Sequence, residues 1–357
     1  MKIKRLVTEN FRNLGNLDLP FDQDFVVFVG RNGIGKTSVL EAIYYSSLLL
    51  AFPPARTWEQ ISFDSDYFRI TLQVDGKKME YYYGKKEEKR YLRSQSIDGL
   101  KKKSSEFWGV LPCVSFLPQD LNLLLLSPSL RRDYLDEILL QTDRGYGSTL
   151  SDFNKTLTQR NELLFQITEG AAGVKELDFW DEKLFHLATT ITERRQGLAE
   201  HINRDLEKIY FENTQSKNGI KFKYNPSVKV FLNEENRLLP DSLRTRDLRA
   251  GRTTWGPQLD DWTVLDENDR KISHYFSRGE QRSVMICLKL KEFSYIKESL
   301  GRKPVLLLDE LFAELDSERK EFIAKNLPAG TQVFVTTTSL DELPEAFVKK
   351  AQVLQLQ

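Results

Sequence analysis

The chain has 357 residues, of which 40% are hydrophobic, so it can form one large domain or two smaller ones with sizeable cores. Its 52 basic and 52 acidic side chains cancel, which excludes binding to nucleic acid or membrane through overall charge. Two cysteines are too few for a disulfide framework, and the sequence has neither a signal peptide nor an apolar run of about 18 residues that could span a membrane. We therefore expect a cytoplasmic protein with no membrane partner.

The first third of the chain is predicted to consist of strands and one helix. Residues 1–11 alternate between polar and apolar, FVVFVG at 25–30 is typical of a short buried strand, and TSVLEAIYYSSLLL at 37–50 is typical of a helix. Two further strand patterns follow at 67–75 and 78–84. This order indicates a β-rich start to an α/β domain.

Helical spacing replaces the strand patterns from about Leu121. The longest apolar stripe runs from Leu177 to Ile209, roughly 33 residues at a period of about 3.5. Too few heptads are present for a long solitary coiled coil, so we expect helices packed as a compact arm. Strand patterns return after about residue 220, at 220–231, 305–310 and 332–338.

A glycine-rich segment, GRNGIGKT at 30–37, separates the buried strand from the following helix. It fits the pattern G-x-x-x-x-G-K-[ST], in which successive backbone N–H groups turn onto phosphates at a helix N-terminus. The ammonium group of Lys36 would reach the β and γ phosphates, and the hydroxyl of Thr37 would ligate Mg²⁺. The segment therefore predicts a nucleotide site that contains Mg²⁺.

Two acids end the apolar strand at 305–310, VLLLDE, at the end of the strand where α/β sheets bind ligands. Asp309 would hold Mg²⁺ through water, and Glu310 would polarise the attacking water. We therefore expect Lys36, Asp309 and Glu310 to be the catalytic residues.

The segment SRGEQRSV at 277–284 precedes an amphipathic helix and then the acidic strand, which is the order of an ABC-type ATPase signature. Ser277 and the N–H of Gly279 lie at a predicted helix start, a place suited to a phosphate. AELD at 313–316 fits the D-loop that follows the acidic strand in such enzymes. ABC transporters usually carry a histidine after the next strand, where this chain has threonines at 336–338. Because a hydroxyl is a poorer acid or base, we expect slow hydrolysis.

Beyond these motifs, the chain resembles the RecF family of bacterial recombination mediators, which are SMC-like ABC ATPases. The resemblance covers nearly the whole chain. Its most specific parts are the SPS…RR block of SFLPQDLNLLLLSPSLRRDYLDEILL at 115–140 and the QRN run of LSDFNKTLTQRNELL at 150–164. The opening NFRN at 10–13 and GRTTWGPQLDD at 251–261 extend it. The resemblance implies an α/β fold, an ABC-type P-loop ATPase head that consists of a mixed sheet with helices. The head would comprise residues 1–122 and 216–357, and a short helical arm domain at 123–215 would interrupt it.

The resemblance implies that ATP is the nucleotide and that two molecules share each site. Gln119 would join the head to the arm and help Thr37 and Asp309 to hold Mg²⁺. Ser277 and Gly279 would act on the ATP of a second subunit. The implied cofactor-binding residues are Arg12, Asn13, Gly30, Arg31, Asn32, Gly33, Ile34, Gly35, Lys36, Thr37, Ser38, Gln119, Ser277, Gly279, Gln281 and Thr337.

The family uses ATP-dependent dimerisation to hold duplex DNA near single-strand gaps, and with the proteins RecR and RecO it promotes recombinase loading. We therefore expect an ATP-dependent homodimer that binds DNA in recombinational repair, with weak, DNA-stimulated ATP hydrolysis as the release step. The alternatives are a structural SMC-like head and a transporter-type energy-coupling subunit. The roughly 240 residues between Thr37 and Ser277 argue against the latter, in which the signature lies much closer.

Two segments depart from the pattern of the family. Gln258 and Leu259 replace a basic pair in the segment Gly-Pro-His-Arg-Asp-Asp, which bears on any DNA or ATP-sensing role of that loop. Glu280 places an acid in the signature, where a carboxylate beside a partner's phosphate would repel it unless Arg278 or Arg282 compensates.

Local basic clusters are the candidate DNA contacts. Between Lys77 and Lys103 the sequence has ten Lys and Arg against four acids, an excess of six (10 − 4). Phosphate contacts of this kind give salt-sensitive affinity without sequence preference, and solvated hairpin tips are the alternative interpretation. We expect the contacts from Lys101, Lys102, Lys103, Arg131 and Arg132.

Overall fold

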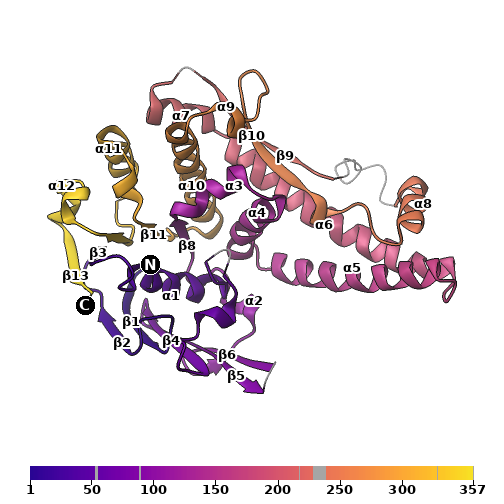
Figure 1. Ribbon diagram of the computed structural model, residues 1–357, viewed down its shortest axis with the longest axis horizontal. Coiled ribbons are helices and arrows are strands. Elements are labelled where there is room, and N and C mark those ends of the chain that lie inside the picture. Colours follow the sequence, from indigo (N-terminus) through magenta and orange to yellow (C-terminus); the bar gives the residue numbers. More distant parts are fainter. Residues whose placement is uncertain (53–54, 88–89, 217, 228–238, 328, 357) are drawn as a thin grey trace. The chain divides into compact units, whose positions relative to one another are not determined.

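The computed structural model describes the chain except residues 53–54, 88–89, 217, 228–238, 328 and 357. It divides into two compact units. The first contains Met1–Leu121, Lys208–Lys217 and Ser277–Gln357, and the second contains Asn122–Glu207 and Asn218–Phe276. Each is described by itself below (Figure 1).

The first unit contains a five-stranded sheet whose neighbouring strands all run parallel, in the order β13-β3-β12-β11-β8. Every residue of β11 and β12 is buried, as expected of central parallel strands covered on both faces. The strands are β3 Phe25–Val29, β8 Cys113–Phe116, β11 Val305–Asp309, β12 Val333–Thr337 and β13 Ala351–Gln355.

A six-stranded antiparallel sheet completes the first unit, in the order β2-β1-β4-β5-β6-β7. Helix α1, Lys36–Leu48, contacts β4 of this sheet and also β11 and β12 of the parallel sheet, and residues 39–48 are all buried. The helix therefore lies between the two sheets. The strands are β1 Ile3–Glu9, β2 Leu17–Pro20, β4 Tyr67–Val74, β5 Lys77–Glu87, β6 Arg90–Ile97 and β7 Leu100–Lys101.

Helix α10, Arg278–Leu300, contacts β8, and Asn213 Nδ2 of α7 donates to Ser283 O in α10 (3.3 Å). The other helical elements of this unit are η1 Thr57–Gln60, α2 Ser104–Phe107, η2 Pro118–Leu121, η6 Leu311–Glu314, α11 Ser317–Asn326, η7 Leu340–Glu342 and α12 Glu345–Val348, with α7 running Leu206–Thr214. The strands expected at 25–30, 67–75, 305–310 and 332–338 are confirmed, as is the helix at 37–50. The mixed α/β fold is therefore as predicted.

The second unit is a set of helices that packs on a two-stranded antiparallel ribbon. Helices α5 and α6 pack against each other, and α6 also contacts β9 and α4 (Figure 1). The elements are α3 Asn122–Leu125, α4 Pro128–Thr142, α5 Tyr146–Thr168, η3 Val174–Glu176, α6 Leu177–Asn203, β9 Ile220–Asn225, α8 Asp241–Ala250, η5 Pro257–Leu259, β10 Asp261–Asp266 and α9 Ile272–Tyr275.

The structure differs from the expected boundaries in two places. The long apolar stripe is not one helix, because α6 ends at Asn203 and Asp205 adopts a left-handed φ of 59° before α7 begins. Residues 218–276, which we expected to return to the head, lie with the helical unit. The reason is packing: Asn203 holds Phe222 of β9 through two hydrogen bonds, 2.7 Å to its carbonyl and 2.9 Å from its N–H.

A buried ion cluster fixes the helical unit around Arg160, the arginine of the QRN run. Arg160 is fully buried, with Nε 2.8 Å from Asp181 Oδ1 and Nη1 2.8 Å from Asp247 Oδ2. Its guanidinium carbon lies 5.4 Å from the centre of the Trp255 ring, and Nη1 also donates to Thr253 Oγ1. This motif residue of α5 is therefore used to hold α6, α8 and the loop after α8.

Candidate nucleotide site

The glycine-rich loop connects β3 to α1, and its glycines have a steric reason. Gly33 and Gly35 adopt φ values of 83° and 108°, in the left-handed region that favours glycine. A Cβ at Gly35 would also lie 2.8 Å from the side chain of Leu14. The backbone from Gly30 to Lys36 thus turns at the N-terminus of α1, where free N–H groups and the helix dipole favour an anion.

The side chain of Lys36 is turned onto this loop and is only 3% exposed. Its Nζ donates to Gly30 O (2.9 Å) and Arg31 O (3.2 Å), and lies 3.4 Å from Asn32 Oδ1. The carboxylate of Glu310 lies 3.5 Å away. The ammonium group is therefore held at the mouth of the loop by carbonyls that a phosphate can replace.

Thr37 and Asp309 form a hard oxygen pair beside the loop. The Thr37 hydroxyl donates to both carboxylate oxygens of Asp309, at 2.9 and 3.1 Å. Burial raises the pKa of Asp309, while the hydroxyls of Thr336 and Thr37 act in the opposite direction. A buried carboxylate and a hydroxyl at this spacing match the ligands that Mg²⁺ prefers, and the cation would relieve the desolvation of Asp309.

The backbone of Glu310 is fixed by a hydrogen bond, while its side-chain carboxylate is partly exposed to solvent. Its φ of 48° is unusual for a non-glycine residue, and its N–H donates to Thr336 Oγ1 at 2.9 Å. Thr336 Oγ1 in turn donates to Asp309 Oδ1 at 2.7 Å. One threonine therefore positions both acids that follow β11.

The structure brings Thr336, rather than Thr337, to the acids. Thr336 pairs with Asp309 in the register of β11 and β12, which places the two side by side. Thr337 and Thr338 instead donate to the two oxygens of Glu342, at 2.5 and 2.9 Å. The pairing of the strands, which no local motif encodes, decides which threonine faces the site.

The first hairpin lies against the loop through Arg12 and Asn13. Asn13 Nδ2 donates to Gly33 O (2.9 Å), and Ser38 Oγ donates to Asn13 Oδ1 (2.8 Å). The guanidinium group of Arg12 forms two hydrogen bonds, 2.8 and 2.7 Å, with the buried carboxylate of Glu41. Sequence reasoning missed Glu41, because a glutamate within a helix gives no signal of its own.

A cavity of about 860 Å³ extends from Thr37 and Ser38 past this hairpin to a group of aromatic side chains. Trp58, Phe63 and Tyr91 line it and are all exposed. Exposed aromatic rings next to a phosphate loop are suited to a planar base. These rings could not be grouped from the sequence, because they come from separate segments.

The signature begins α10 with a capping box. The Ser277 hydroxyl accepts a hydrogen bond from the Glu280 N–H at 3.3 Å, and Glu280 Oε2 accepts from both the Ser277 N–H and its hydroxyl at 2.8 Å. Ser277 is exposed, while Gln281 is buried. The acid at position 280 therefore has a structural reason, since it completes the cap of the helix.

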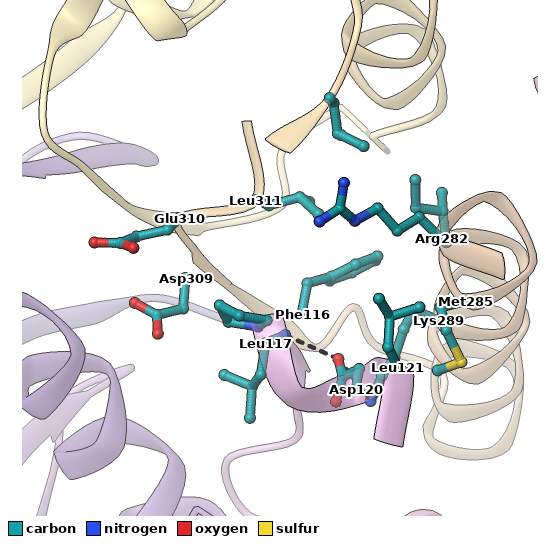
Figure 2. A pocket seen from close by; sticks show the side chains of 13 residues that line it. Phe116, Leu117, Asp120, Leu121, Arg282, Met285, Lys289, Asp309, Glu310 and Leu311 are labelled. Atoms are coloured by element: carbon teal, nitrogen blue, oxygen red, sulfur yellow. Dashed lines mark hydrogen bonds and ion pairs between the residues drawn. The ribbon is translucent and has the colours of Figure 1, made fainter. Parts of the chain in front are cut away.

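A pocket lies between the acidic strand end, the turn η2 and helix α10 (Figure 2). Figure 2 shows Asp309 and Glu310 at one end, and Asp120 and Lys289 at the other. Asp120 Oδ2 accepts a hydrogen bond from the Leu117 N–H at 2.8 Å, which shapes the turn that carries the partly exposed Gln119. Burial raises the pKa of Asp120, and Lys289 opposes the rise.

The candidate DNA contacts are placed in different settings. Lys101 is exposed on β7, while Lys102 pairs with Glu106 at 2.9 Å. Arg131 instead binds both oxygens of Asp261, at 2.6 and 3.0 Å, with its side chain 13% exposed. Arg132 Nη1 donates to Asp260 O at 2.9 Å. The structure therefore uses this arginine pair within the helical unit, in contacts far apart in the sequence.

Comparisons with known proteins give a consistent result. Residues 1–49 match the AAA ATPase domain family. The chain is 34% identical over 343 residues to the DNA replication and repair protein RecF of Agathobacter rectalis, covering 96% of this chain and 93% of that protein. It is 31% identical over 367 residues to the RecF of Halalkalibacterium halodurans, covering 100% and 98%. None of the helices among the described residues combines the length and apolar character that a bilayer crossing needs.

Solved structures agree with these relatives. A structure described as the recombination mediator protein RecF-ATPrS in the RecFOR pathway has a TM-score of 0.86 and 32% identity, covering 100% of this chain and 96% of that one. A second, RecF-ATP in the same pathway, has a TM-score of 0.84 and 31% identity, covering 96% and 93%. An Smc head bound to part of ScpA is similar in fold alone, with a TM-score of 0.55 and 15% identity.

Proposed function

The chain belongs to the RecF family of DNA replication and repair proteins, and from this premise we propose that it is an ATP-driven DNA clamp of recombinational repair. Two copies would close over DNA near single-strand gaps, and slow hydrolysis would release it. The observation that carries the proposal is that Lys36, Thr37, Asp309 and Glu310 converge on one loop, although two of them lie more than half the chain away. A transporter-type role has no comparable support, because the relatives are repair proteins over their full length.

ATP with Mg²⁺ would supply an electrophilic phosphorus and a neutralised triphosphate. Lys36 would exchange the carbonyls of Gly30 and Arg31 for phosphate oxygens. Thr37 and Asp309 would hold the cation, helped by Gln119 of the turn η2. Glu310 would accept a hydrogen bond from the attacking water and orient it, with Thr336 fixing the backbone from which it acts.

The adenosine end would lie toward the first hairpin. Arg12, Asn13 and Ser38 line the cavity that leads away from Thr37, and Trp58 and Tyr91 would border the base. The signature of each copy, Ser277 and Gly279, would close on the ATP of the other. Proteins of the RecR and RecO type are the proposed partners in loading recombinase.

The test is the mass of a Glu310→Gln variant in saturating ATP, with and without gapped duplex DNA. The amide cannot act as a general base, a change that costs about 10²–10⁴ in rate, so ATP-bound dimers should accumulate. Gapped duplex should increase the fraction of dimer and be retained in it. A Lys36→Met variant, as the control, should fail to bind ATP and stay monomeric. A Glu310→Gln protein that remains monomeric with ATP would show that the clamp mechanism is wrong.

Within the basic cluster between Lys77 and Lys103, we propose the β7 face that carries Lys101 as the DNA contact, because Lys101 is exposed there and Lys103 is exposed just beyond it. Lys89 of this cluster lies outside the described residues. Reversing the charge of Lys101, Lys102 and Lys103 to Glu should weaken duplex binding by at least about 10-fold in low salt and flatten its dependence on salt. The measurement is fluorescence anisotropy at several salt concentrations. Reversing Lys155 and Lys175 of the helical unit is the control, and an unchanged salt slope in the triple variant would exclude this face.

A further inference from the structure

Arg319 connects two loops that are proposed to act on the same second molecule. It lies in the first turn of α11, and its backbone N–H donates to Asp316 Oδ1, the last residue of the D-loop, at 2.9 Å. Its Nη1 also pairs with Asp316 Oδ2. The backbone N–H and the guanidinium group of Arg319 therefore both bind the carboxylate of Asp316.

The same guanidinium group reaches the signature turn of α10. Its Nε donates to Ser283 Oγ at 2.7 Å, and Ser283 Oγ donates to the carbonyl of Gly279 at 3.2 Å. Its Nη2 lies 3.6 Å from the position that a Cβ on Gly279 would take. The guanidinium group thus lies close to the glycine that is proposed to face a phosphate, with only 23% of the side chain exposed.

The signature turn carries a negative charge that this arginine can offset. Glu280 places its carboxylate on the N–H and hydroxyl of Ser277, the groups that a phosphate would otherwise use. The nearby phenol of Tyr210 responds to both charges: burial raises its pKa to about 12, Glu280 contributes to the rise, and Arg319 opposes it. The two charged groups therefore act on one small region with opposite signs.

We infer that Arg319 is a positioning residue that locks the D-loop to the signature turn and offsets part of the charge of Glu280, so that this face can meet the γ-phosphate of ATP on a second copy of the chain. The inference rests on the proposed dimer. Arginine suits the task because its fork bonds Asp316 and Ser283 at once, which the single ammonium group of a lysine does with poorer geometry. Sequence reasoning expected Arg278 or Arg282 to compensate the acid, since both are its neighbours in the chain.

The experiment compares Arg319→Gln, Arg319→Lys and the control Lys325→Gln, each in the Glu310→Gln background. Lys325 lies on the same helix and is 77% exposed. Monomer affinity for a fluorescent ATP analogue should change less than about 2-fold in all three. The dissociation constant of the ATP-bound dimer should rise at least about 10-fold in Arg319→Gln, less in Arg319→Lys, and not in Lys325→Gln.

The double variant Arg319→Gln, Glu280→Gln tests the role of charge. If Arg319 only held the loops in place, removing the charge of Glu280 would not restore dimer affinity. We expect the double variant to regain part of the lost dimer affinity, because the charge is offset again while the side-chain bonds to Asp316 and Ser283 stay broken. Dimerisation that is unchanged in Arg319→Gln, or that Glu280→Gln fails to restore, would overturn the inference.

The monomer supplies a separate readout, so that failure of the inference and failure of the proposed function can be told apart. If the parent Glu310→Gln protein does not dimerise, the proposed function is wrong, and the inference is judged by hydrogen exchange. Amides at 279–283 and 316–319 should then exchange faster in Arg319→Gln than in Lys325→Gln. Equal exchange in the two variants would contradict the lock between the loops.

Discussion

A Ser277→Arg variant should bind ATP as the unchanged protein does and lose ATP-dependent dimerisation. Ser277 is exposed at the start of α10, and nothing in the phosphate loop contacts its side chain among the described hydrogen bonds. An arginine there would fill the space proposed for the γ-phosphate of the partner and would break the capping box. The measurement is native mass in saturating ATP in the Glu310→Gln background, beside an equilibrium titration with an ATP analogue.

Two further variants show whether Ser277→Arg loses dimerisation because the arginine blocks the partner's γ-phosphate or because helix α10 is less stable. Loss of the cap costs about 1 kcal/mol, so thermal unfolding should shift only slightly. Ser277→Thr keeps a capping hydroxyl and should dimerise, while Ser294→Arg adds the same charge far along α10 and should also dimerise. If Ser277→Arg forms the dimer as readily as Ser294→Arg, the signature does not meet the partner's nucleotide.

The parts of the site that could be predicted are those whose residues are neighbours in the sequence. The loop from Gly30 to Thr37 needs glycines at fixed offsets, and β11 needs an apolar run that ends in acids. Both patterns are complete within a few residues, so the strand, the turn and the helix could be assigned without a structure. The meeting of Thr37 and Asp309 at 2.9 Å then follows from the parallel sheet, because strand ends gather at one edge.

The parts that could not be predicted depend on pairs of residues far apart in the sequence. Glu41 holds Arg12 across 29 positions, and Thr336 reaches Asp309 only through the register of β11 and β12. Arg131 looked like a DNA contact because its partner, Asp261, lies 130 residues later. A charged residue in a sequence shows its sign but not whether another side chain already neutralises it.

The return of strand patterns after residue 220 shows the same limit at the scale of domains. Alternation predicted β9 at the start of the segment 220–231, but it gave no prediction for β10 and could not say on which unit these strands pack. The answer lies in side chains such as Trp262, whose Nε1 donates to Arg131 O at 2.6 Å. The alternation of polar and apolar residues predicts which face of a strand is buried. It does not predict which helix or strand packs on that face.

An Arg160→Met variant should destabilise the helical unit by about 3–5 kcal/mol, because it leaves buried carboxylates without their main counter-charge. Asp247 is fully buried and Asp181 nearly so, and methionine supplies volume but no donor. Urea unfolding followed by circular dichroism measures the loss. Arg144→Met, a change at an exposed arginine of the same unit, is the control and should cost less than about 0.5 kcal/mol.

The pH dependence of this loss separates charge from packing. Burial already raises the pKa of Asp181, and Arg160 opposes that rise, so the pKa should climb further in the variant. A carboxylate with a raised native pKa binds more protons in the folded than in the unfolded state, so stability falls as pH rises through that pKa. Arg160→Met should therefore lose more stability at about pH 8 than at about pH 5, whereas a packing defect would cost the same at both. A double variant with Asp247→Asn should lose less than the sum of its two changes, because it removes one of the stranded charges.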